Sequence, residues 1–227
     1  MSKPKLVAAV HPFDAQRAKN IGYLTMQVGW EMADGVLYRP GDPSPCDIIC
    51  CRVYGQYLPQ TAKSLSRECL NQGSSGIFLD IDGELPNDIE AEHFGKTPLS
   101  FFSTADLPFS TPVHPIIFGE GWLNSIPSGA AVFISRICRQ TRIPKIGTPI
   151  SRTLSEESLR ESISRFKPKI CRSKALCADY FYASDGEDTI FTVFESRESL
   201  QDKLSLLYSR GVEYCFFKFG ELGELLT

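Results

Sequence analysis

The sequence predicts an α/β fold, a compact (β/α)8 barrel in which some helices are shortened to loops. Two observations predict it: short apolar or β-branched runs alternate with amphipathic stretches, and nine such runs occur in 227 residues. Alternating strands and helices indicate a parallel sheet with helical crossovers. Nine strands are too many for an open sheet of five or six but suit an eight-stranded barrel plus one hairpin strand, at about 28 residues per unit against roughly 31 typically. We therefore expect residues 1–227 to form one barrel domain.

The strands are predicted from runs rich in Val, Ile, Phe and Tyr, which favour a pleated and partly buried surface. Turn-forming residues separate most of these runs, so each is read as a separate strand. In chain order they cover residues 5–10, 35–38, 47–53, 76–82, 113–118, 130–135, 175–182, 189–194 and 212–219.

Two helices are predicted from apolar residues at helical spacing and from their first turns. Residues 59–71 place Leu65, Cys69 and Leu70 on one stripe. Residues 154–166 contain, near their start, a serine of the N-cap type followed by two acids, which the positive end of a helix favours. Both segments therefore suit crossovers or covers on the outside of a sheet.

A third helix is predicted over residues 197–210. Leu200, Leu204 and Leu207 recur on one face, and a glycine directly after the segment provides a C-terminal stop. Residues 86–129 show only a weak helical pattern and contain many Pro, Ser and Phe residues. We therefore expect loops to replace some helices of the barrel there.

The charge balance argues against a sequence-general nucleic-acid binder. The chain has 24 Lys and Arg against 27 Asp and Glu, a formal net charge of −3, so nothing draws it to nucleic acid or to an anionic membrane. The N-terminal apolar run, residues 6–10, is too short for a signal peptide, and no later stretch approaches the roughly 18 uncharged residues of a membrane helix. We expect a cytoplasmic protein without nucleic-acid or membrane partners.

The cysteines and histidines give no metal-site pattern. The eight cysteines form no Cys-x-x-Cys pair, and several lie inside apolar runs, which favours buried reduced thiols over disulfides. The three histidines are far apart and form no His-x-x-x-His pair. We expect neither a metal nor a cofactor.

Three acids at the end of the fourth predicted strand are the strongest candidates for chemistry. Asp80, Asp82 and Glu84 are two residues apart, so they share one face as long as the strand continues. Carboxylates this close repel one another, which predicts that the pKa of at least one is raised, as a general acid needs near neutral pH. The alternative is a strand-end turn in which a cation or helix end satisfies the acids.

The string around these acids resembles glycoside hydrolase family 18, the chitinase-like barrels. The family pattern at the end of the fourth strand is Asp-Gly-hydrophobic-Asp-hydrophobic-Asp-x-Glu. Asp80, Asp82 and Glu84 match its last five positions, whereas Ile77 and Phe78 stand in place of its leading Asp and Gly. The resemblance implies that Glu84 protonates the leaving oxygen and that Asp82 orients the substrate N-acetyl group, which acts as the nucleophile. Asp80 would support Asp82.

The same string also resembles the first motif of the haloacid dehalogenase-like phosphatases. That resemblance implies Asp80 as nucleophile and Asp82 as acid/base around Mg²⁺, with Glu84 in place of the usual Thr. In those phosphatases the motif lies on the first strand, whereas about 75 residues precede it here. The position therefore favours the chitinase-like family.

The C-terminal region also resembles the end of a chitinase-like barrel. An aromatic strand, an acidic turn, a helix with Ser199, Leu200 and Lys203, a glycine and a last strand follow one another as in that family. The family's last strand usually presents a Trp as the floor of the sugar site, and this chain has Lys218 and Phe219 in that region. These two residues are candidates for substrate binding.

Three further residues are candidates for substrate binding. Arg52 and Tyr54 leave the strand at 47–53 at the same end of the sheet as the acids. Trp122 follows the strand at 113–118 and suits either a sugar-stacking platform or a side chain that packs a loop onto the barrel.

We therefore predict a family 18-like protein that hydrolyses or binds β-linked N-acetylhexosamine glycans of the chitin or peptidoglycan type. The expected partner is a carbohydrate ligand, and the sequence leaves the oligomeric state open. Two alternatives stay open at this point. One is an inactive barrel that binds a glycan or serves a structural role, and the other is the Mg²⁺-dependent phosphatase.

Overall fold

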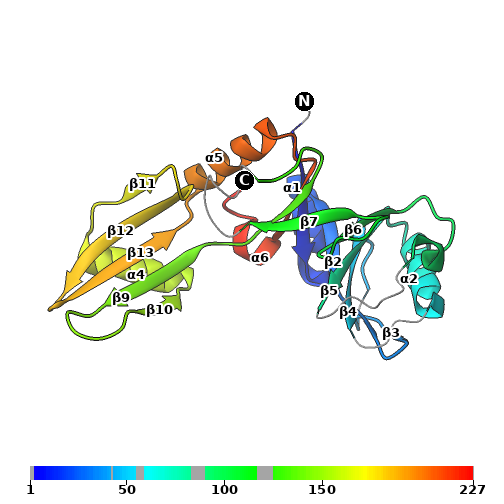
Figure 1. The fold of residues 1–227 in the computed structure, drawn as a ribbon, viewed down its shortest axis with the longest axis horizontal. Helices are drawn as coiled ribbons and strands as arrows, with labels where there is room; N and C mark the ends of the chain where they lie inside the picture. The colour runs from blue at the N-terminus through cyan, green and yellow to red at the C-terminus, as the bar shows by residue number, and fades with distance from the viewer. Residues whose placement is uncertain (1–2, 42, 55–58, 83–89, 117–124, 227) are drawn as a thin grey trace.

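Eight parallel strands close into a barrel in the computed structural model, which describes residues 3–41, 43–54, 59–82, 90–116 and 125–226. The strand β1 pairs with both β2 and β14, and this pairing closes the ring and confirms the predicted fold class (Figure 1). A short strand, β3, extends β2 as an antiparallel hairpin outside the ring. In barrel order from β1, the strands are β1 (Lys5–Val10), β2 (Leu24–Ala33), β4 (Ile48–Tyr54), β5 (Gly76–Ile81), β6 (Ser100–Ser103), β7 (Thr111–Ile116), β8 (Ala131–Ile134) and β14 (Tyr214–Lys218), with β3 at Val36–Tyr38.

The helices around the barrel are few and partly very short. In the described residues they are η1 (Pro12–Asp14), α1 (Ala15–Ile21), α2 (Pro59–Asn71), η2 (Ala91–Phe94), α5 (Arg197–Ser209) and α6 (Phe219–Leu222). The predicted helices at α2 and α5 are confirmed, but Leu70 of α2 is 46% exposed, since it lies about 100° around the helix from the buried Cys69. None of the helices in the described ranges is long and apolar enough to cross a membrane.

A second sheet of five antiparallel strands lies in the chain between β8 and α5. Its strands run in the order β10-β9-β13-β12-β11, and α4 packs on one face (Figure 1). The serine predicted as an N-cap, Ser155, accepts a hydrogen bond from the Ser158 amide and starts α4. The bounds are β9 (Cys138–Ile143), β10 (Ile150–Thr153), α4 (Glu156–Phe166), β11 (Cys171–Ser173), β12 (Ala178–Asp185) and β13 (Asp188–Phe194).

The expectation that residues 175–182 and 189–194 are barrel strands is wrong. They belong to β12 and β13, which pair antiparallel, and only two residues separate Asp185 from Asp188. A turn this short makes a hairpin, because parallel strands need a crossover of about a dozen residues or more. Gly186, with φ of +68°, provides the left-handed conformation that such a turn requires. That residues 1–227 form one domain stays a prediction.

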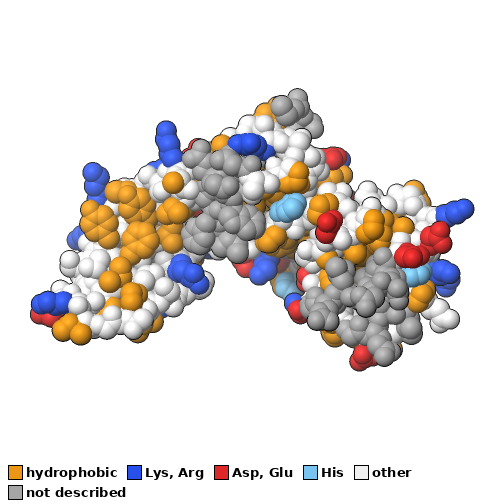
Figure 2. Space-filling model, in the orientation of Figure 1, with side chains coloured by type: hydrophobic (Ala, Val, Ile, Leu, Met, Phe, Trp, Pro, Cys, Tyr) orange, Lys and Arg blue, Asp and Glu red, His pale blue; other side chains and the backbone are white. Residues whose placement is uncertain are grey.

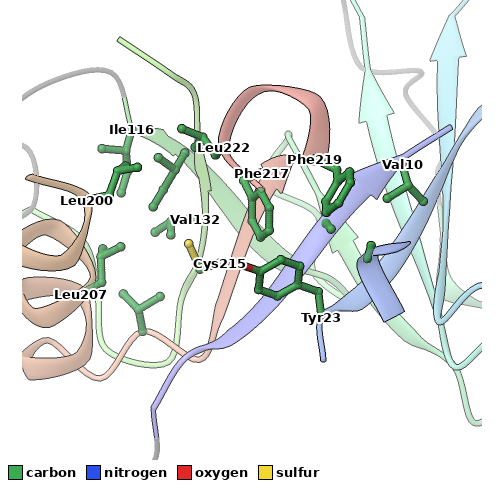
Figure 3. Packing of buried hydrophobic residues seen from close by; sticks show 14 of the residues in the cluster. Val10, Tyr23, Ile116, Val132, Leu200, Leu207, Cys215, Phe217, Phe219 and Leu222 are labelled. Atoms are coloured by element: carbon green, nitrogen blue, oxygen red, sulfur yellow. The ribbon is translucent and has the colours of Figure 1, made fainter. Parts of the chain in front are cut away.

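Aromatic side chains fill the inside of the barrel. Phe78, Phe102 and Phe216 project inward from three strands, and the rings of Phe78 and Phe102 each lie 5.1 Å from that of Phe216. A second apolar layer lies between the strands and α5, where Leu200 and Leu207 pack against β7, β8 and β14 (Figure 3). The barrel is therefore a packed core, and ligands can reach it only at its ends.

The chain segment that forms the antiparallel sheet begins and ends beside a buried ion pair. Glu195 directly follows β13, and its carboxylate pairs with the Lys203 ammonium of α5, both side chains being fully buried. The second carboxylate oxygen of Glu195 accepts a hydrogen bond from the Ile137 amide, and the Glu195 amide donates to the Ile137 carbonyl. This pair therefore joins the exit of β8, the end of β13 and α5.

All eight cysteines are free thiols, and six of them are buried. Burial raises the pKa of the Cys215 thiol to about 12, so only about one thiolate in 10,000 molecules is present there at pH 8. Cys171, on the edge strand β11, is only half-buried.

We expect Ellman's reagent at pH 8 to modify one thiol of the native chain ahead of the others, that of Cys171. Cys171→Ser removes this first phase, whereas Cys215→Ser leaves it unchanged, because thiolate and access together set the rate. All eight thiols react once the chain is unfolded in denaturant. A first phase that persists in Cys171→Ser would contradict this assignment.

Candidate functional site at the barrel mouth

The carboxylates of Asp80 and Asp82 lie on the inner face of β5 at its C-terminal end. Phe78 points into the barrel, while Ile77 and Leu79 pack outward beneath α2. The strand ladder continues to Asp82, whose amide donates to the Val53 carbonyl, so the alternation of faces holds that far. The two side chains are 38% and 65% exposed. They therefore line the mouth rather than the packed core.

Arg52 of β4 lies opposite Asp80 and contacts both acids. Its guanidinium is 3.6 Å from a carboxylate oxygen of Asp80 and 3.6 Å from one of Asp82. These distances are longer than direct hydrogen bonds, and the groups are exposed, so the contacts are screened charge pairs. The positive charge nevertheless reduces the mutual repulsion that the acids have by themselves.

Glu31 of β2 belongs to the same cluster, although sequence reasoning missed it. The Tyr54 hydroxyl donates a hydrogen bond of 2.6 Å to the Glu31 carboxylate, and this bond is the main cause that raises the pKa of Tyr54. The available signal was a polar residue between the apolar Trp30 and Met32. Glu31, Arg52 and Tyr54 thus bring a hydrogen-bonding surface beside the two aspartates.

The two candidates at the end of β14 diverge. Lys218 is exposed and donates a hydrogen bond of 3.0 Å to the Glu221 carboxylate. Phe219 is only 4% exposed and packs near Tyr23 in the core outside the strands (Figure 3). The structure does not bring Phe219 to the mouth, because α6 begins at this residue and its side chain follows the helix.

Glu84 and Trp122 lie outside the described residues. The described part of the mouth around β5 therefore contains the carboxylates of Glu31, Asp80 and Asp82 with the Arg52 guanidinium among them. The pair of Lys218 and Glu221 at the end of β14 adds no net charge. An excess of negative charge disfavours anionic substrates such as phosphate esters and suits an uncharged ligand with hydroxyl and amide groups.

The chain is similar to three solved structures, a spore cortex-lytic enzyme and two chitinases. The spore cortex-lytic enzyme SleL of Bacillus cereus has a TM-score of 0.68 at 14% identity, covering 97% of this chain and 72% of that one. A chitinase of Chromobacterium violaceum gives 0.63 at 12%, covering 95% and 93%. A mutant family 18 chitinase of Cycas revoluta, solved with (GlcNAc)4, gives 0.59 at 10%, covering 93% and 94%. This chain has the fold of a family 18 barrel.

The sequence itself gives no such match. No protein-family model matches the chain, and no curated protein matches it. At identities of 10–14%, the likeness concerns the fold alone. In the ring counted from β1, β5 is the fourth strand, which is the strand that the resemblance assigned to the acidic string.

The closed barrel contradicts the phosphatase alternative. In those phosphatases the acidic string lies on the first strand. The structure instead has a closed ring in which β5 is the fourth strand. The haloacid dehalogenase-like interpretation of Asp80 and Asp82 is therefore wrong for this chain.

Proposed function

We propose that this family 18 barrel hydrolyses β-linked N-acetylhexosamine glycans, of the chitin or peptidoglycan type, at the mouth where β5 ends. One observation carries the proposal: Asp80 on the inner face of the fourth barrel strand and Asp82 directly after that strand come four and two residues before Glu84. In the family this position holds the acids of the reaction.

The proposed reaction has two displacement steps. The acetamido oxygen of the substrate attacks the anomeric carbon, the glycosidic bond breaks, and Glu84 gives its proton to the leaving oxygen. Asp82 holds the acetamido group in position, and Asp80 supports Asp82. Water then attacks the anomeric carbon, and Glu84 takes back a proton as the acetamido oxygen leaves.

The remaining candidates have binding roles in this proposal. Arg52 offers donors for sugar hydroxyls beside the aspartates, and Lys218 offers a donor at the end of β14. The Tyr54 hydroxyl donates its proton to Glu31, so its oxygen offers an acceptor. Trp122 is proposed to stack on a sugar ring. Phe219 has no role, because it is buried in the core.

A test follows from the role of the acetamido group. The chain should cleave (GlcNAc)4 and leave the fully de-N-acetylated tetrasaccharide intact, because the latter lacks the internal nucleophile. Product release is followed by chromatography, with both substrates at equal concentration. Cleavage of both substrates would contradict the proposed reaction.

Binding without hydrolysis is the second candidate function. Arg52 favours it, since its guanidinium already contacts both aspartates that would position the substrate. In that case (GlcNAc)4 binds in calorimetry but is not cleaved.

A further inference from the structure

The turn between β9 and β10 exposes apolar side chains to solvent. It lies at the end of the antiparallel sheet away from the barrel (Figure 1). Ile146, in the middle of the turn, is 89% exposed, and Ile150 and Ile143 at its two ends are 69% and 42% exposed. Because large apolar side chains gathered on a surface indicate an interaction site, this turn needs a partner. We name residues 143–150 the apolar tip.

A cleft that is lined by three arginines adjoins the apolar tip. It lies between β10 and α4 and has a volume of about 540 Å³. Ile150 lines it from the tip, and Phe166, the last residue of α4, lines it from the helix. Guanidinium groups bind the oxygens of phosphates and carboxylates through paired hydrogen bonds, so the cleft suits an oxyanion that carries an apolar group. The three arginines are Arg142, Arg152 and Arg165.

Two acids, Glu161 and Asp185, share the cleft with these arginines. Asp185 pairs with Arg142 at 3.6 Å and with Arg165 at 2.6 Å. Arg152 instead donates to a side-chain amide oxygen of β9 at 2.9 Å and forms no ion pair with the acids that the structure describes. Since a guanidinium has five N–H donors, Arg152 keeps both its charge and most of its donors for a ligand.

The charge around the apolar tip differs in sign from that of the whole chain. Residues 142–152, 161–169 and 185–188 contain six Lys or Arg against four Asp or Glu, whereas the formal net charge of the chain is −3. All three acids of 185–188 pair with Lys or Arg side chains of this group. Figure 2 shows apolar and basic side chains side by side at this end of the molecule. The expectation of no membrane partner rested on the whole-chain charge, which hides this local surplus.

A bilayer that contains anionic lipid complements both features of this end of the sheet. Its interface takes up a protruding apolar segment, and its phosphates attract basic side chains that surround the segment. A free phosphate would contact the arginines alone and would leave the isoleucines in water. A protein partner would need a hollow shaped to the turn, whereas a fluid lipid layer closes around it without one.

We propose that this end of the antiparallel sheet docks on an anionic lipid bilayer. Ile146 and Ile150 enter the headgroup region, and the phosphate of a lipid lies in the cleft against Arg152. The docking holds the barrel at a membrane surface and leaves the barrel mouth free. It is therefore independent of the proposed hydrolysis.

The test measures binding of the full chain to vesicles by flotation. One set contains phosphatidylcholine and phosphatidylglycerol in equal parts, and the other contains phosphatidylcholine alone. Ile146→Ser should weaken binding to the anionic vesicles about tenfold, because the isoleucine is no longer removed from water. Arg152→Gln should weaken it about fivefold, as expected for one basic residue at an anionic surface. Leu70→Ser and Arg67→Gln, on the exposed side of α2, are the matched controls and should change nothing.

Three further measurements separate the competing explanations. Ile146→Trp should keep the binding, and anionic vesicles should shift the emission of the added tryptophan to shorter wavelengths, since Trp favours the membrane interface. Inorganic phosphate at matched ionic strength should not release the chain from the vesicles. Without vesicles, sedimentation should give the same mass for the parent and Ile146→Ser.

Several results would overturn the inference. The parent might be shown to ignore anionic vesicles or to bind both sets equally, either of which excludes an anionic lipid partner. Ile146→Ser or Arg152→Gln binding as tightly as the parent excludes the tip or the cleft as the contact, and an unshifted tryptophan emission excludes entry into the interface. Release by inorganic phosphate identifies a free anion as the ligand, and a change of mass in Ile146→Ser identifies a second copy of the chain as the partner.

Discussion

Replacing Lys203 by methionine is expected to lower the free energy of unfolding by about 3–5 kcal/mol. The ammonium of Lys203 is fully buried against Glu195, so its removal leaves a buried carboxylate without its counter-charge. Methionine keeps most of the volume, so the loss reports charge rather than a cavity. Denaturant unfolding measures this loss of stability: the midpoint concentration should fall while the slope of free energy against denaturant stays the same.

A double variant separates the pair from its surroundings. Glu195→Gln combined with Lys203→Met should recover at least half of the loss, because the neutral amide no longer needs a counter-charge. Its carbonyl oxygen can still accept the hydrogen bond from the Ile137 amide. Lys63→Met on the exposed side of α2 serves as the surface control, with an effect of about 0.5 kcal/mol or less. If the free energy of unfolding of Lys203→Met lies within 1 kcal/mol of that of the parent, the ion pair does not stabilise the fold as expected.

Replacing Glu84 by glutamine is expected to lower kcat on (GlcNAc)4 by a factor of about 10²–10⁴. Glutamine keeps the shape of the side chain but cannot give a proton to the leaving oxygen. The dissociation constant for the oligosaccharide should change only a few-fold, because ground-state contacts are kept. Steady-state kinetics and calorimetry measure the two quantities separately.

The leaving group provides a control within the same variant. An N-acetylglucosaminide with a nitrophenyl leaving group needs little protonation, so Glu84→Gln should slow its cleavage much less. Glu92→Gln, an exposed acid of η2, should behave as the parent on both substrates. Equal losses on both substrates would point to a damaged site rather than a missing proton donor.

The barrel was predictable from the sequence because most of its strands are continuous apolar runs. Two barrel strands were missed. In β2 the pattern breaks at a bulge, where Gly29 has φ of +101° and the register shifts. Before the bulge the even-numbered Met26 points into the barrel, and after it the odd-numbered Glu31 lies on the inner face. The strand β6 has only four residues, with serine at both ends. Neither gives a periodic signal over enough residues.

The candidate site was predictable where it follows strand alternation. Asp80, Asp82 and Arg52 share the inner face because each lies an even number of residues from an inward neighbour on its own strand. Glu31 was missed because β2, the strand that places it opposite Arg52, was not predicted from the sequence. Phe219 was expected at the mouth because an apolar run does not reveal where a strand ends and a helix begins. Since α6 begins at Phe219, its side chain packs in the core outside the strands.

The junction of Ile137 with Glu195 makes this barrel suited to grafting. The Glu195 amide donates to the Ile137 carbonyl at 2.9 Å, so the chain leaves and re-enters the ring through a single gap. Closing a segment whose ends already touch adds little entropy cost whatever its length. The length of residues 138–194 can therefore change while the ends of the segment stay together, provided that contacts with α5 such as the Arg172–Asp202 ion pair are kept. The same ring can in this way carry inserted segments of different length.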